Sequence, residues 1–141
     1  MVTLICPYCS QPAKCVGFGG KLYPYQADYG WLYVCGPCQA YVGCHKGGQK
    51  PLGSLANAEL RTLRHEAHLA FDPLWKIKMQ KSSATKAYAR SAGYAWLASE
   101  LSLPVSQMHI GQLNIVQCRR VIELCHYIAQ RNLERRGHEK V

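Results

Sequence analysis

Two short stretches, Cys6-Pro7-Tyr8-Cys9 and Cys35-Gly36-Pro37-Cys38, with 25 residues between them, determine how the first part of the chain folds. In each stretch a tight turn can direct two thiolates toward one ion, and two such turns supply the four sulfur ligands that suit tetrahedral zinc. We therefore predict one structural Zn²⁺, and its expected ligands are Cys6, Cys9, Cys35 and Cys38. A site closed by four thiolates leaves no coordination position open for a substrate.

The residues around these pairs predict a small antiparallel sheet. Residues 1–50 contain six of the eight cysteines and many aromatic residues, and Gly17 to Gly20 is typical of a turn. The alternating run Trp31 to Val34 is typical of a strand. We interpret residues 1–50 as a zinc ribbon, in which the strands between the two pairs form the hairpin that brings the thiolates together.

The two cysteine pairs also have the sequences found in glutaredoxin, Cys-Pro-Tyr-Cys, and in thioredoxin, Cys-Gly-Pro-Cys. A redox pair needs a position at the start of a helix, where the helix dipole lowers the pKa of a thiol. Pro12 interrupts the residues after the first pair, and Gln39 to Gly43 is typical of a strand after the second. We therefore favour one zinc site over two redox centres.

Residues 51–141 form the second predicted part of the chain, which is rich in helix-forming residues. Apolar residues that recur with helical periodicity predict three helices, over residues 57–70, 84–101 and 115–135. The fold class is therefore α+β, a zinc ribbon followed by a three-helix unit. We expect this unit to pack on the ribbon, either as a second domain or within one compact domain.

Polar and proline residues mark the expected ends of these helices. Asn57, Ser83 and Asn114 are the predicted N-caps. Gln117 stands where it would complete a capping box with Asn114, and Pro73 is expected to prevent the first helix from continuing.

Composition places the chain among globular proteins, because 48% of its 141 residues are hydrophobic and 18% are charged. No apolar run approaches the roughly 18–20 residues that a membrane span needs, and the N-terminus lacks the pattern of a secretion signal. Eight cysteines without an export signal favour a reducing compartment, so we expect a cytoplasmic protein. Cys118 and Cys125 fall on the apolar face of the third helix and are expected to be buried thiols.

The charge favours a polyanionic partner, nucleic acid first, because 17 Lys and Arg against 8 Asp and Glu give a net charge of +9. Aromatic rings can stack on bases, and basic side chains can contact phosphates. The candidate contact residues are Lys14, Lys21, Tyr25, Trp31, Arg119, Arg120, Arg131 and Arg135. Two other interpretations stay open: the rings can form the core of the ribbon, and the arginines can belong to a solvated helix face that pairs with Glu123 and Glu134.

The sequence contains no familiar catalytic motif, neither a P-loop, a Gly-x-Ser-x-Gly elbow nor a metalloprotease helix. The residues that could take part in catalysis are His65, His68, Asp72 and His109. Because they form no recognised constellation, we expect no enzymatic activity. Cys15, Cys44 and His45 receive no role from the sequence.

Several short motifs in combination resemble the zinc-finger-containing domain family of phage and prophage proteins, over about residues 5–125. They are the two cysteine pairs, Ala40 to His45, Pro51 to Gly53, Phe71 to Lys76, Tyr94 to Leu97, His109 to Gly111, and Cys118. Ser10 stands where the family pattern has glycine, and Asn57 where it has aspartate. The resemblance implies zinc and a bacterial host or phage-infected cell, and it implies no assigned activity.

We therefore expect a small, non-enzymatic, phage-type zinc-ribbon protein that binds nucleic acid or a nucleic-acid complex. The alternative is a protein-binding effector that inhibits a host or anti-phage defence enzyme, since positive charge would also match an acidic groove. No membrane partner is expected. Binding at several salt concentrations separates the two, because phosphate contacts weaken steeply with salt.

Overall fold

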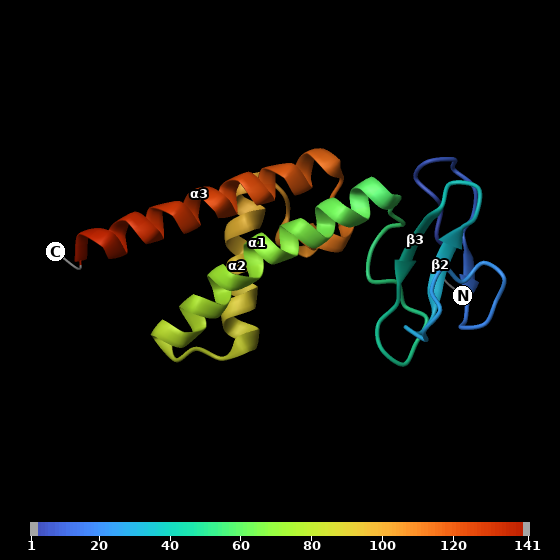
Figure 1. The fold of residues 1–141 in the computed structure, drawn as a ribbon, viewed down its shortest axis with the longest axis horizontal. Helices are drawn as coiled ribbons and strands as arrows, with labels where there is room; N and C mark the ends of the chain where they lie inside the picture. Colours follow the sequence, from blue (N-terminus) through green and yellow to red (C-terminus); the bar gives the residue numbers. More distant parts are fainter. Residues whose placement is uncertain (1–2, 140–141) are drawn as a thin grey trace. The chain divides into compact units, whose positions relative to one another are not determined.

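A small sheet comes first and long helices follow in the computed structural model, which describes residues 3–139 (Figure 1). This order confirms the predicted α+β class. The chain divides into two compact units, one that ends at Arg61 and one that begins at Thr62.

Three short antiparallel strands form the sheet, in the order β1-β2-β3. Their bounds are β1 Lys14–Val16, β2 Leu32–Cys35 and β3 Ala40–Gly43. All four residues of the central strand β2 are buried. The register pairs Cys15 with Tyr33 and Cys35 with Ala40, so Cys35 enters the second cysteine pair directly from the end of the central strand.

The core of the first unit is small and surrounds the cysteine pairs. Its buried members are Cys6, Tyr33, Cys35, Ala40 and Leu55. Two of these five residues are predicted metal ligands, so the apolar side chains that remain bury little surface by themselves.

The first unit extends past residue 50, where composition suggested a boundary, as far as Arg61. Backbone bridges join Cys44 to Pro51 and Tyr41 to Ala56, the second through two N–H···O bonds of 3.1 Å. These bridges supply partners to the outer edge of β3, whose backbone groups would otherwise depend on water. The residues after position 50 therefore complete the sheet.

Three long helices follow, with bounds α1 Ala58–Ser82, α2 Lys86–Leu101 and α3 Ile115–Glu139. Two 3₁₀ turns, η1 Val105–Gln107 and η2 Ile110–Gln112, lie between α2 and α3. None of the helices within residues 3–139 combines the length and the apolar character that crossing a membrane requires.

The predicted end of the first helix at residue 70 is wrong, because α1 continues through Pro73 to Ser82. Proline removes one helical hydrogen bond and disfavours the helical conformation of the residue before it. Phe71 and Trp75, on either side of the proline, are 1% and 5% exposed. Their burial favours the helix on both sides of Pro73 and outweighs the local cost.

The predicted caps have mixed outcomes. The Asn57 side chain accepts from the Leu60 N–H at 3.0 Å, and Asn114 and Gln117 exchange two hydrogen bonds of 2.8 and 3.0 Å, which confirms both caps. Ser83 is not the cap of α2: Thr85 takes that place and accepts from the Tyr88 N–H at 3.2 Å. Sequence spacing alone could not decide whether Ser83 or Thr85, two hydroxyl residues two positions apart, is the N-cap.

The core of the second unit lies among its own helices. Cys118, Val121 and Cys125 of α3 are each fully buried, as the periodicity predicted, whereas Leu133, which the same periodicity placed inward, is 62% exposed. Arg64 is only 9% exposed, and its Nε and Nη2 donate to the Leu113 carbonyl at 3.1 and 3.0 Å. This buried guanidinium connects α1 to the chain just before α3, and helical periodicity gave no sign of it.

Candidate metal centre and nucleic-acid interface

The four predicted zinc ligands come together, with all of their sulfur atoms within 4.8 Å of one another. The Cys9 and Cys35 sulfurs are 3.6 Å apart. In a tetrahedron with zinc–sulfur bonds of about 2.3 Å, adjacent sulfurs lie ~3.8 Å apart, so the arrangement fits one zinc ion. Cys6 and Cys35 are buried, while Cys9 and Cys38 are half-buried. One structural zinc held by four thiolates is therefore the metal centre of the first unit.

The two turns that carry these ligands share a backbone feature. The residue directly after each pair, Ser10 and Gln39, has a positive φ, of 62° and 50°. The Ser10 N–H donates to the Cys6 carbonyl at 2.9 Å, and the Gln39 N–H donates to the Gly36 carbonyl at 3.1 Å. Each left-handed residue therefore closes its turn and leads the chain away from the metal.

The thiol pKa values show why the cluster needs a cation. Burial acts to raise the pKa of Cys6, but hydrogen bonds from the Tyr8 and Cys9 backbone outweigh it and lower the pKa. The hydrogen bond with the Cys9 side chain, followed by burial, raises the pKa of Cys38 to about 12. Without a cation, the Cys38 thiol therefore stays protonated at neutral pH. Zn²⁺ supplies the positive charge that allows four thiolates to share one site.

Neither cysteine pair has the setting of a redox centre. β3 begins at Ala40, directly beyond the second pair, and the first pair is followed by residues that lead into β1 at Lys14. Neither pair lies at the N-terminus of a helix, so no helix dipole lowers a thiol pKa as thioredoxin-like chemistry requires.

Cys15 and Cys44 lie beside the sheet core and not in the metal centre. Both pack against the buried cluster, and after burial they are the next causes that raise the pKa of Tyr33. The Tyr33 hydroxyl donates to the Gln49 carbonyl at 2.8 Å. Among the described residues, only the four zinc ligands form a group that could hold a metal ion.

An exposed aromatic cluster covers part of the first unit. We call it the aromatic ladder, and its members are Phe18, Tyr23, Tyr25, Tyr29 and Tyr41. Edge-to-face contacts, which branch at Tyr25, join them with ring centroids 4.9 to 6.3 Å apart. The most exposed rings are Tyr29 at 66% and Phe18 at 54%. Of the four predicted contact residues in this unit, Tyr25 belongs to the ladder and is 40% exposed.

The other three predicted contacts of this unit, Lys14, Lys21 and Trp31, are also exposed. The Trp31 ring lies over Gly17, where a Cβ atom would come within 3.1 Å of it. Tyr33, by contrast, is 4% exposed and belongs to the core. Tyr33 is therefore part of the ribbon core, while Tyr25 and Trp31 lie at its surface.

The loop that carries the ladder is held by its own hydrogen bonds. The Tyr23 hydroxyl donates to the Gly30 carbonyl at 2.7 Å and accepts from the Tyr29 N–H at 2.9 Å. Asp28 accepts from the Gly30 N–H at 2.9 Å. These bonds order a segment that has no regular strand or helix, so the rings are positioned in advance.

Arg61 is a member of this surface that the sequence analysis missed. Its guanidinium lies 3.7 Å from the Tyr41 ring centroid and donates to the Ala56 carbonyl at 2.6 Å. A cation over a ring face is attractive, and here it fixes a positive charge at the end of the ladder. Only the fold brings residue 61 to β3, so spacing in the sequence carried no signal for it.

The four predicted arginines of α3 are all exposed. Arg120 pairs with Glu123 at 3.2 Å, and the Arg131 guanidinium donates to the Tyr127 hydroxyl at 3.3 Å. Glu134 accepts from Gln130 at 3.3 Å. The predicted pairing with an acidic residue is therefore present for Arg120, while Arg131 is placed beside an exposed aromatic ring. The helix thus presents a charged and aromatic surface.

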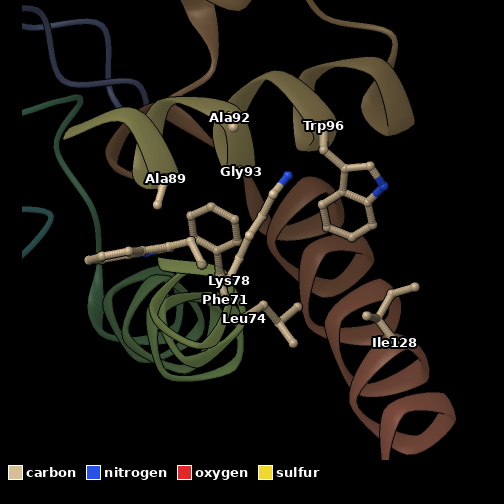
Figure 2. A pocket seen from close by; sticks show the side chains of 9 residues that line it. Phe71, Leu74, Lys78, Ala89, Ala92, Gly93, Trp96 and Ile128 are labelled. Atoms are coloured by element: carbon tan, nitrogen blue, oxygen red, sulfur yellow. The ribbon is translucent and has the colours of Figure 1, made fainter. Parts of the chain in front are cut away.

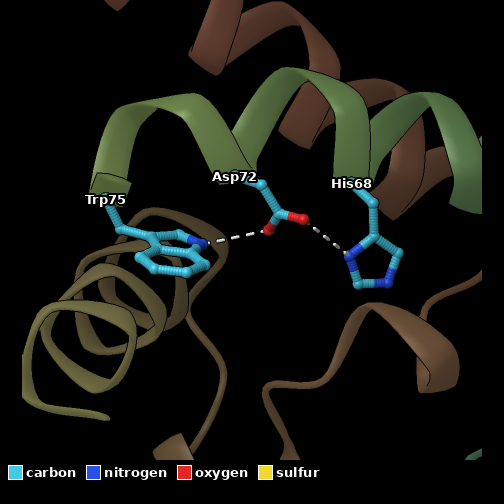
Figure 3. A network of polar contacts seen from close by, with 3 residues as sticks. All are labelled: His68, Asp72 and Trp75. Carbon is cyan, nitrogen blue, oxygen red and sulfur yellow. Dashed lines mark hydrogen bonds and ion pairs between the residues drawn. The ribbon is translucent and has the colours of Figure 1, made fainter. Parts of the chain in front are cut away.

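A polar network on α1 contains two of the residues considered for catalysis (Figure 3). Asp72 lies 4.0 Å from His68 Nδ1 and accepts from the Trp75 indole N–H at 3.0 Å. Burial lowers the pKa of His68 from 6.5, and Asp72 opposes this effect only in part. His68 is therefore largely neutral at pH 7, and the main effect of Asp72 is to fix the Trp75 indole.

Comparison with known proteins finds one match, to the family model described as a zinc-finger-containing domain, over residues 2–128. The matched region covers both the metal centre and most of the helical unit. No curated protein and no solved structure shows significant similarity to the chain.

Proposed function

The chain belongs to the zinc-finger-containing domain family, and from this premise we propose that it is a non-enzymatic protein that binds single-stranded nucleic acid. Zinc acts here by stabilising the ribbon, since four thiolates leave no open position for chemistry. The binding surface of this proposal therefore lies outside the metal centre.

The aromatic ladder is the observation that supports this proposal best. Proteins that bind single strands commonly combine exposed rings, on which bases stack, with basic side chains that track the phosphates. Tyr25 and Tyr29 are exposed, Arg61 is fixed at one end of the ladder, and Lys21 lies in the same loop. Burial, followed by the Tyr41 hydroxyl, raises the pKa of Tyr25 to about 12, which reflects how closely the two side chains pack.

The arginines of α3 support the same proposal through charge. Arg119, Arg120, Arg131 and Arg135 are exposed on one helix, and the chain carries a net charge of +9. Each arginine that neutralises a phosphate releases a counterion, so such contacts make the affinity depend on salt. Stacking releases few counterions, so the two kinds of contact can be told apart.

The test measures the affinity for a fluorescent oligothymidine at several salt concentrations. Arg120→Ala with Arg131→Ala should weaken binding and make the log–log salt slope shallower by about one to two units. Tyr25→Ala with Tyr29→Ala should weaken binding by about 1–3 kcal/mol per lost stacked base, with little change in slope. Lys86→Ala, an exposed charge on α2, is the control and should change neither quantity appreciably.

Absence of binding to DNA and RNA at low salt would overturn the proposal. The protein-binding effector would then be the better explanation of the same charge, and its partner would be sought among host and defence enzymes. Binding that depends on salt but not on the ladder would show that the rings have a structural role only.

A further inference from the structure

The helices of the second unit line an apolar cavity of about 230 Å³ that is partly open to solvent and separate from the surfaces discussed above (Figure 2). The principal lining residues are Phe71, Leu74, Trp75, Lys78, Trp96 and Ile128, which come from all three helices. From this lining we propose that the cavity is a binding site for a small aromatic carboxylate. The inference goes beyond the proposed function and does not depend on it.

The cavity has fixed walls. A Cβ atom on Gly93 would lie 2.9 Å from Phe71 Cζ and 3.4 Å from Trp75 Cβ, so glycine allows α2 to approach these side chains closely. The Trp75 indole is held by its hydrogen bond to Asp72. Phe71 and Trp75 are both buried. A site whose walls are already ordered loses little entropy when a ligand binds.

The lining favours an aromatic ligand body over a nucleobase. Trp96 is half-buried and offers ring surface to a ligand, whereas Phe71 and Trp75 are 1% and 5% exposed and form the packed wall beside it. Aromatic ring pairs attract one another beyond their buried area. The Trp75 N–H is already bonded to Asp72, and Figure 2 shows the Trp96 ring nitrogen on the side away from Lys78. A nucleobase would therefore lose the hydrogen bonds its polar edge makes with water, and this loss is costly.

Lys78 selects an anionic group. Among the described residues that line the cavity it carries the only charge, and Figure 2 shows its side chain extending between Phe71 and Trp96 toward α2. Because Lys78 is otherwise exposed, its ammonium group stays hydrated at the cavity mouth and can meet a carboxylate there. The ligand is thus an apolar ring that enters the cavity and a carboxylate that remains at the rim.

The test uses the whole zinc-loaded chain and 2-naphthoate as the probe, followed by the indole N–H signals in ¹H–¹⁵N spectra. The signals of Trp75 and Trp96 should move, and that of Trp31, in the other unit, should not. A dissociation constant between about 10 µM and 1 mM is expected for a ligand of this size. The neutral 2-naphthylmethanol should bind more weakly.

Variants test separately whether the cavity binds the ring and whether Lys78 binds the carboxylate. Lys78→Gln should weaken 2-naphthoate binding about three- to tenfold and leave the alcohol unaffected, whereas Lys81→Gln, a nearby exposed lysine, should change neither. Ala92→Leu fills part of the cavity and should weaken both ligands about tenfold or more. If Ala92→Leu fails to fold, the Lys78 comparison still decides the question.

Three results would overturn the inference. One is the absence of any shift of the Trp75 and Trp96 signals at about 5 mM 2-naphthoate. Another is an equal effect of Lys78→Gln and Lys81→Gln. The third is tighter binding of adenosine monophosphate than of 2-naphthoate, which would identify a nucleotide site.

Discussion

Ser10 and Gln39 occupy the least favourable backbone positions of the metal centre. Each directly follows a cysteine pair, and each has a positive φ. A residue with a Cβ atom pays roughly 1–2 kcal/mol in the left-handed region, whereas glycine adopts it without this cost. Both side chains are exposed, so neither residue is retained by packing. The backbone strain lies directly beside the zinc ligands, where the metal overcomes it.

Glycine at either position should therefore stabilise the zinc-loaded protein. Ser10→Gly and Gln39→Gly are each expected to raise the free energy of unfolding by about 0.5–1 kcal/mol, since the greater entropy of unfolded glycine offsets part of the relief. Chemical denaturation in the presence of zinc measures this change. Ser10→Ala and Gln39→Ala keep the Cβ atom and serve as controls; a gain as large in these variants would contradict the explanation.

At the scale of elements, α1 and α3 show two ways in which a helix is specified. α3 has an apolar face at regular spacing and a capping box formed by Asn114 and Gln117, so local signals agree with packing. α1 contains Pro73, which opposes the helix locally, and it forms because Phe71 and Trp75 are buried on either side. α1 therefore depends on tertiary contacts, whereas in α3 the cap, the apolar spacing and the packing all favour the same helix.

The buried face of α3 gives a direct test of this packing. Val121→Asp places an unpaired charge at a fully buried position and should destabilise the second unit by about 3 kcal/mol or more. Val116→Asp makes the same change on the same helix at a position that is 73% exposed, and it should cost less than about 1 kcal/mol. Thermal unfolding followed by circular dichroism compares the two. Similar losses in both variants would show that α3 does not pack through this face.

For the whole molecule, the two units are stabilised in different ways. The second has a core of its own, with Phe71, Leu97 and Val121 among its fully buried side chains. The first has a buried cluster of five residues, of which Cys6 and Cys35 are zinc ligands. Metal binding can contribute roughly 10–16 kcal/mol of apparent stability in small zinc domains, so zinc is the main stabilising element of the first unit.

Removal of zinc should therefore unfold the first unit selectively. With a strong chelator, or in Cys35→Ser, the amide signals of β2 and β3 should collapse to unfolded positions while most helical circular dichroism remains. Elemental analysis should find about one zinc per chain before treatment. Cys15→Ser, outside the metal centre, is the matched control and should keep its zinc. A metal-free protein with an intact sheet would contradict this role of the ion.

The sequence by itself determined the features that depend on short spacing. Two Cys-x-x-Cys pairs predicted a four-thiolate zinc centre because each pair forms a local turn, and the fold has only to bring two turns together. The α3 periodicity predicted its buried cysteines for the same reason, since positions on one helix face follow from 3.6 residues per turn. Such signals involve residues that are only a few positions apart in the chain.

Only the tertiary structure decided the features that join distant residues. It continued α1 through Pro73, added residues 51–56 to the edge of β3, and placed Arg61 over Tyr41. It also formed the cavity between the helices of the second unit, where Gly93 allows close approach to Phe71. Each of these outcomes depends on burial or pairing between segments far apart in the chain, and in α1 these contacts outweigh the local preference against the helix.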